Sequence, residues 1–143
     1  MGCIFMFNLF KKSKYEKVGF EDIKKVIVCK SHLLINTLTS QEQTVLIKGT
    51  VNINDEENVI NEILSNYMVP DKPVILYGKN CCDNSVETKF EQIQNLGIKE
   101  VSIYYGGLFE WLLLSELYGN EEFPLTTDGA KLDIQKFRPE SKL

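Results

Sequence analysis

A short polar loop at residues 78–84 carries the residues best suited to chemistry in this chain. It reads GKNCCDN, so two adjacent thiols lie beside a lysine and a carboxylate. The loop follows the apolar run VILY at 74–77 and precedes a segment with helical periodicity. A strand that leads directly into a helix presents unpaired N–H groups, which stabilise anions and lower the pKa of a nearby thiol. The loop therefore has the parts of an anion cradle or of a nucleophilic-thiol site.

The loop residues have candidate roles in that chemistry. Cys81 and Cys82 are candidate catalytic nucleophiles, and Lys79 places a cation beside them. The candidate anion- or substrate-binding residues are the rest of the loop and the first helical residue, namely Gly78, Lys79, Asn80, Asp83, Asn84 and Ser85. The alternative interpretation is a polar loop whose cysteines are incidental, because a vicinal pair is a weak signal.

Two side chains are candidate caps for the helix that follows the loop. Asn84 and Glu87 have the three-residue spacing of a capping pair. Asp83 is a second candidate cap, and its negative charge opposes formation of a thiolate nearby.

Alternating strands and helices position this loop. Short apolar runs predict buried strands at 33–35, 74–77 and 101–105. Apolar residues at helical spacing predict helices at 20–27 and 55–67. They also predict a helix that follows the loop 78–84 and stops at Gly97, and another helix through Trp111. This order predicts one α/β domain with a central, mainly parallel sheet flanked by helices. Functional sites in such sheets lie at the carboxyl ends of the strands, which selects the loops 78–84 and 105–108.

Some finer expectations also follow from the pattern. Residues 45–53 predict a turn and a further short strand, and Leu96 is expected to face inward on its helix. Cys29 is expected to be a small buried side chain, and Trp111 a core anchor.

Composition excludes several function classes. The 143 residues carry 20 acidic and 16 basic side chains, a net charge of −4, which argues against nucleic-acid binding. No apolar run approaches the ~20 residues of a membrane span. Because His32 stands alone and no cysteine pair has metal-ligand spacing, we expect no metal, and no cofactor is expected either. The cysteine pattern and the lack of a signal peptide favour a cytoplasmic location.

The N-terminal leader, residues 1–17, carries a second candidate feature. Met-Gly-Cys places Gly2 and Cys3 where N-myristoylation and palmitoylation occur, and the basic residues Lys11, Lys12 and Lys14 follow. A lipid chain with a basic patch would attach the protein to a membrane surface. However, Met6 stands where the motif requires Ser or Thr, so an unmodified apolar start that packs on the domain is the alternative.

Three segments of the chain resemble the rhodanese-like domain family, over about residues 20–111. LLINTL at 33–38 resembles the opening strand LIDVR, and LIKGTVNI at 46–53 resembles HIPGAINI. The strand at 74–77, the loop and GGLFEW at 106–111 resemble VVYC…GG…W, which is the most specific part. The resemblance implies a rhodanese-like α/β fold, with a leader at 1–17, the domain at 18–118 and a C-terminal extension at 119–143.

Departures from the family pattern decide what the resemblance implies about activity. Active sulfurtransferases of the family hold a sulfane sulfur as a persulfide on a cysteine directly after the third strand. Here that position is Gly78, and the Asp and Arg of the opening strand are replaced by Asn36 and Leu38. These departures favour a non-catalytic binding or regulatory module with an unknown protein partner. The alternative is a sulfurtransferase or persulfide carrier, in which Cys81 or Cys82 serves as nucleophile and passes sulfur to an unknown acceptor.

Phosphatase relatives of the family are a further class to consider. They bind phosphate through a Cys-x5-Arg loop, whose arginine clasps the anion with two hydrogen bonds. The one arginine of this chain, Arg138, lies far from the loop in sequence. We therefore expect no arginine near the loop and no phosphatase activity.

Overall fold

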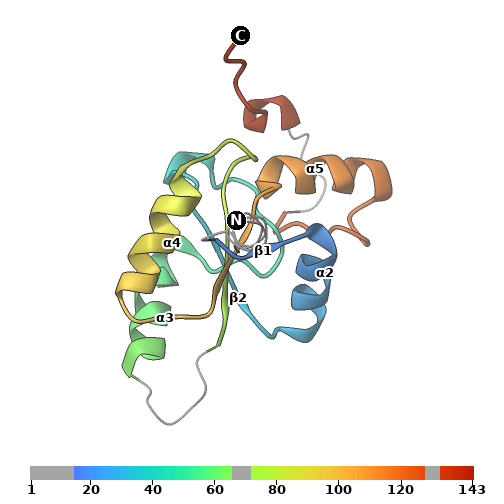
Figure 1. Cartoon of the computed structure of the whole chain (residues 1–143). Coiled ribbons are helices and arrows are strands. Elements are labelled where there is room, and N and C mark those ends of the chain that lie inside the picture. Colours follow the sequence, from blue (N-terminus) through green and yellow to red (C-terminus); the bar gives the residue numbers. More distant parts are fainter. Residues whose placement is uncertain (1–14, 66–71, 128–132) are drawn as a thin grey trace, which may run out of the picture.

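A parallel sheet of four strands forms the middle of the computed structural model, which describes residues 15–65, 72–127 and 133–143 (Figure 1). The strands lie in the order β1 (Lys17–Val18), β4 (Val101–Tyr104), β3 (Val74–Tyr77) and β2 (Leu33–Asn36), and each pairs in parallel with its neighbour. The three predicted strands and their parallel arrangement are confirmed. Because Asn36, Tyr77 and Tyr104 are in register, β2, β3 and β4 end level at one edge of the sheet.

Helices cover both faces of this sheet. α3 (Ile53–Ser65) and α4 (Ser85–Asn95) lie on one face, while α2 (Phe20–Cys29) and α5 (Gly107–Tyr118) lie on the other (Figure 1). Two short 3-10 helices, η1 (Ser40–Glu42) and η2 (Ile134–Phe137), complete the described elements. None of the described helices is long and apolar enough to cross a membrane.

Strand alternation divides the core between the two faces. On β3, Ile75 and Tyr77 join the core under α2 and α5, whereas Val74 and Leu76 join the core under α3 and α4. Trp111 is fully buried in the first of these clusters, as predicted. Its indole N–H donates to the carbonyl oxygen of Pro124 at 3.1 Å, so the residues after α5 are bound to the domain core.

Residues 45–53 do not form the predicted strand. Ile47 and Thr50 make only isolated bridges, to Leu125 and Leu34 respectively. The Thr50 N–H and hydroxyl both donate to the carbonyl oxygen of Ile47, which closes a turn in place of a ladder. Ile53 is already the first residue of α3.

Two side chains expected inside are exposed. Leu96 is 55% exposed because α4 ends at Asn95 and Gly97 follows with φ +110°, so the buried role passes to Ile98. Cys29 is exposed because it ends α2 away from the buried stripe of Ile23 and Val26.

Candidate functional site

The loop 78–84 joins β3 to α4 at the carboxyl edge of the sheet, and the first amides of α5 hold its backbone. The Leu108 N–H donates to the carbonyl oxygen of Gly78 and the Phe109 N–H to that of Lys79, both at 2.9 Å. Gly107 makes this approach possible, because it has φ +69° and a Cβ there would lie 2.8 Å from the Gly78 carbonyl oxygen. The N-terminus of α5 therefore binds loop carbonyls.

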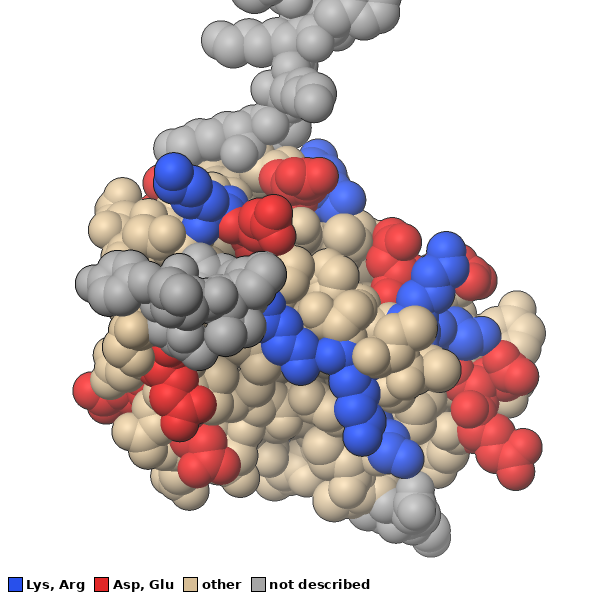
Figure 2. All heavy atoms as spheres, turned by 90° about the horizontal axis from the view of Figure 1, so that it is seen from below, with Lys and Arg blue, Asp and Glu red and all other residues tan. Residues whose placement is uncertain are grey.

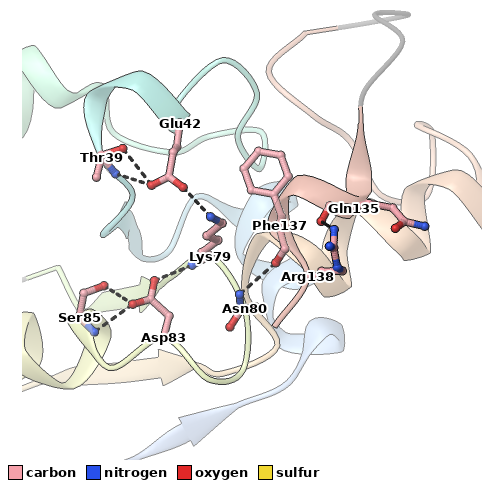
Figure 3. Close-up of polar contacts among 9 residues, drawn as sticks. All are labelled: Thr39, Glu42, Lys79, Asn80, Asp83, Ser85, Gln135, Phe137 and Arg138. Atoms are coloured by element: carbon pink, nitrogen blue, oxygen red, sulfur yellow. Dashed lines mark hydrogen bonds and ion pairs between the residues drawn. The ribbon is translucent and has the colours of Figure 1, made fainter. Parts of the chain in front are cut away.

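Asp83 turns its carboxylate back into the loop (Figure 3). One oxygen, Oδ2, accepts the N–H of Lys79 at 2.9 Å. The other, Oδ1, accepts the N–H of Ser85 at 3.0 Å and the Ser85 hydroxyl at 2.6 Å. N–H groups that would stabilise a bound anion are thus occupied by a carboxylate of the chain itself.

The predicted cap is therefore made by Asp83 and not by Asn84. Asn84 has helical backbone angles and makes no side-chain capping bond, and the Glu87 carboxylate instead accepts the Tyr105 hydroxyl. The expected capping pair of Asn84 and Glu87 is wrong because Asp83 already accepts the N–H of Ser85, the first helical residue. Burial of the phenol is the largest cause that raises the pKa of Tyr105, to about 12, and the contact with the Glu87 carboxylate raises it further.

The Asp83 carboxylate and the Val86 side chain lie directly against Gly78. A Cβ at this position would lie 2.7 Å from Asp83 Oδ2 and 2.5 Å from Cγ2 of Val86. Both distances are shorter than carbon atoms tolerate, so a cysteine here requires Asp83 and Val86 to move. The present conformation of the loop therefore requires glycine at position 78.

Asn80 ties the loop to the C-terminal segment. Its amide oxygen accepts the Cys82 N–H at 2.9 Å, and its Nδ2 donates to the carbonyl oxygen of Phe137 at 3.0 Å (Figure 3). Asn80 is buried, with 8% of its surface exposed. Its two hydrogen bonds hold the shape of the loop, and Asn80 also lines the cleft beside it.

Both loop thiols are exposed, and their sulfur atoms lie 3.8 Å apart. Partial desolvation raises the pKa of the Cys81 thiol, and the Cys82 thiol and the Glu110 carboxylate raise it further. This direction is opposite to the lowered thiol pKa expected at a helix N-terminus.

The expected cation beside the thiols has another partner. The ammonium of Lys79 forms an ion pair with Glu42 at 2.8 Å, and the Glu42 carboxylate also accepts the hydroxyl of Thr39 (Figure 3). The Lys79 ammonium lowers the pKa of Glu42 as its largest cause. Lys79 therefore joins the loop to η1.

Arg138 lies beside the loop, contrary to the expectation from sequence distance. A cleft of about 790 Å³ is lined by Lys79, Cys82 and Asp83 of the loop and by Arg138 of the C-terminal segment. The buried side chain of Phe137 and the bond from Asn80 hold that segment in place. The arginine Nη1 already donates to the carbonyl oxygen of Gln135 at 2.7 Å (Figure 3).

Phosphatase geometry is still not assembled at this cleft. The sixth residue after Cys81 is Glu87 and the sixth after Cys82 is Thr88, so neither cysteine heads a Cys-x5-Arg loop. In the described part of the chain, no group of three or more His, Cys, Asp or Glu side chains is arranged to hold a metal ion.

Comparison with protein-family models now gives the family. The model of the rhodanese-like domain matches residues 13–114, which is most of the chain and runs from before β1 into α5. The chain belongs to the rhodanese-like domain family. The sequence resemblance is thereby confirmed, and with it the α/β fold. A search of the curated proteins finds no match.

Solved structures of the rhodanese fold superimpose on this chain. The Saccharomyces cerevisiae single-domain sulfurtransferase RDL2 is 18% identical with a TM-score of 0.53, covering 76% of this chain and 98% of its own. The human single-domain sulfurtransferase TSTD1 is 16% identical, with a TM-score of 0.51 and coverages of 68% and 95%. The Alr3790 protein from Anabaena is 15% identical, with a TM-score of 0.56 and coverages of 83% and 97%. At these identities the likeness shows the fold.

The structure places the predicted loop residues relative to the strands, but not the predicted lipidation residues. Gly78 directly follows β3, the position that the family pattern gives to its cysteine, and the fold brings Lys79, Asp83 and Ser85 around one cleft. Cys82 also lines this cleft, whereas Asn84 does not. The candidate lipidation residues Gly2 and Cys3 lie outside the described residues.

Proposed function

We propose that this rhodanese-like domain is a non-catalytic binding or regulatory module, in which an internal carboxylate replaces the bound sulfur anion of active relatives. The observation that carries the proposal is the Asp83 carboxylate, which accepts the N–H groups of Lys79 and Ser85 and lies against Gly78. A persulfide anion needs such N–H groups for its stabilisation.

Charge supports the same proposal. A second anion in this loop would meet the carboxylate of Asp83 at close range, and like charges disfavour each other's ionised form. The ammonium of Lys79 is not available to offset this repulsion, because it is paired with Glu42. The loop is thus stable without a ligand anion.

Turnover of thiosulfate and cyanide tests the proposal. We expect the protein to form no thiocyanate above the buffer rate, even at high enzyme concentration. A double variant, Cys81→Ser with Cys82→Ser, serves as the matched control and is expected to give the same baseline. A parent rate that exceeds the baseline and disappears in this variant would refute the non-catalytic proposal.

The second candidate function is a sulfurtransferase or persulfide carrier that uses Cys81 or Cys82. The observation in its favour is that both thiols are exposed and that Cys82 lines the cleft. Against it, the pKa of Cys81 is raised, which lowers the thiolate fraction at neutral pH. The thiocyanate assay distinguishes the two functions.

We further propose that the leader attaches the domain to a membrane surface through acylation of Gly2, with Cys3 as a second acyl site. The support is the Met-Gly-Cys start followed by Lys11, Lys12 and Lys14. Co-expression with an N-myristoyltransferase should add one myristoyl mass to the parent and none to Gly2→Ala. An unmodified parent under these conditions would contradict the attachment.

A further inference from the structure

A second pocket lies at the opposite end of the sheet from the loop 78–84. It has a volume of about 380 Å³ and is formed where α2 turns into β2 and where the chain enters β3. Its charged and titratable lining consists of Lys30, His32, Lys48 and Lys72, and no carboxylate lines it. A pocket of this size accepts a small ligand.

The three lysines of this pocket have no ionic partner in the part of the chain that the structure describes. The ion pairs there join Lys24 to Glu122, Lys79 to Glu42 and Lys89 to Glu56. These pairs use none of the pocket lysines. Like charges around one concavity repel each other, and a bound anion would remove that repulsion.

Local structure explains only one of the three cations. Lys30 caps the C-terminus of α2 with φ 52°, and a cation is favourable at that end of a helix. Lys48 comes from the turn before Thr50 and Lys72 from the residue before Pro73, so neither is accounted for by a helix end. Three separate segments therefore bring positive charge to one pocket.

His32 adds a further polar group. Its Nδ1 lies 2.8 Å from the hydroxyl of Ser31, so this ring nitrogen already has a hydrogen-bond partner. The remaining nitrogen, Nε2, is the one left to face a ligand.

The surface view agrees with this concentration of charge. Figure 2 shows the molecule from below, with a run of Lys and Arg side chains across the middle of this face and acidic side chains at both sides and near the top. The chain as a whole carries a net charge of −4, so a basic pocket contrasts with the rest of the protein. An acidic body with one basic pocket directs anions to that pocket.

The pocket also has an apolar wall. Val26 and Ile27 of α2 and Leu33 and Leu34 of β2 line it beside the lysines. A ligand that uses the whole pocket therefore carries an apolar group next to its anionic group.

From these features we infer that the pocket binds a phosphate monoester with a small apolar substituent. A phosphate monoester carries a charge of about −1.5 to −2 at neutral pH and three acceptor oxygens, which match three ammonium groups better than a single carboxylate does. The apolar substituent contacts Val26, Ile27 and Leu33. The phosphate belongs either to a free metabolite or to a lipid headgroup.

Phenyl phosphate is the probe for this site. In a titration followed by amide chemical shifts, we expect saturable shifts at residues 30–34, 48–49 and 72, up to about 10 mM ligand. Phenol is expected to cause no such shifts, and inorganic phosphate is expected to bind more weakly than phenyl phosphate. No shifts with phenyl phosphate, or equal shifts with phenol, would overturn the site.

Variants separate the pocket from general charge effects. The double variant Lys48→Gln, Lys72→Gln should weaken phenyl phosphate binding about tenfold or more, because two of the ammonium groups are lost. Lys25→Gln is the matched control, since Lys25 is exposed on α2 and does not line the pocket. Equal loss of affinity in the control and the double variant would overturn the assignment.

Vesicles distinguish the two sources of phosphate. Phosphatidylcholine vesicles with about one fifth phosphatidic acid present the group on a surface. Parent and double variant carry the same basic leader, so only a difference between them reports on the pocket. Sedimentation that falls in the variant identifies a lipid headgroup, whereas equal sedimentation together with specific phenyl phosphate binding identifies a free phosphate ester.

Discussion

At the scale of single residues, the candidate site is defined by Asp83. A βα loop of this kind offers several unpaired N–H groups, which need hydrogen-bond acceptors. Here the carboxylate of Asp83 accepts the N–H groups of Lys79 and Ser85 and the Ser85 hydroxyl. The same carboxylate fills the space next to Gly78. The glycine directly after β3 thus leaves room for the Asp83 carboxylate beside it.

Replacement of Asp83 tests this arrangement through stability. We expect Asp83→Ala to lower the free energy of unfolding by about 1–3 kcal/mol, because the N–H of Lys79 loses a charged acceptor. Asn84→Ala is the matched control, since Asn84 is exposed and makes no capping bond, and it should stay within about 0.5 kcal/mol of the parent. Urea unfolding measures both. Equal effects of the two variants would refute the role of Asp83.

The ion pair of Lys79 and Glu42 makes stability depend on pH. Because the pKa of Glu42 is lowered in the folded state, the pair stabilises the fold above the unfolded carboxyl pKa of about 4.3. This stabilisation is lost as the pH falls through the lowered folded pKa. We expect Glu42→Gln to destabilise the protein by less than about 1 kcal/mol at pH 7, since the pair is partly exposed, and not at all once Glu42 is protonated.

Urea unfolding at neutral and acidic pH checks whether the effect of Glu42→Gln on the unfolding free energy falls with pH, as expected. Glu116→Gln is the control, because Glu116 is exposed on α5 and forms no ion pair in the described structure. A Glu42→Gln effect that grows as the pH falls would contradict the assignment.

At the scale of elements, the C-terminal segment is part of the site. η2 places the buried ring of Phe137 in the core cluster that also contains Trp111, and the Phe137 carbonyl oxygen accepts the amide of Asn80. The family match ends at residue 114, so this contact belongs to the chain beyond the family model. The segment therefore fixes a loop that family relatives use for catalysis.

Phe137→Ala tests this attachment. We expect a loss of about 3 kcal/mol or more in unfolding free energy, because a buried aromatic side chain is removed, and faster hydrogen exchange at the amides of 79–83. Arg138→Ala is the neighbouring control, since its exposed side chain donates only within the segment, and it should leave loop exchange unchanged. Unchanged loop exchange in Phe137→Ala would show that the loop does not depend on η2.

At the scale of the whole molecule, periodicity and motifs predict the frame but not the long-range contacts. The strands at 33–36, 74–77 and 101–104, the helices and the parallel sheet follow from local patterns, and the Gly-Gly and Trp motif identifies the family. The approach of Arg138 to the loop and the pairing of Lys79 with Glu42 do not follow, because they join residues far apart in sequence. The sequence offers both Asn84 and Asp83 as candidate caps of α4, and only the backbone angles of Asn84, which are helical, decide in favour of Asp83.

The basic pocket is likewise not predictable from local sequence patterns. Lys30, Lys48 and Lys72 are separated by 18 and 24 positions, and each is unremarkable in its own segment. Only the fold brings them to one end of the sheet. The loop and the pocket lie at opposite ends of the strands, so ligand binding at one can be tested separately from binding at the other.

The most direct test of the central claim is the intact mass of the protein after incubation with thiosulfate. In an active relative a thiolate attacks the outer sulfur of thiosulfate, forms a persulfide and releases sulfite, which adds about 32 Da. We expect no such adduct on the parent, because Asp83 accepts the N–H groups of Lys79 and Ser85 and position 78 carries no thiol. An adduct of about 32 Da that disappears in Cys81→Ser or Cys82→Ser would contradict the account.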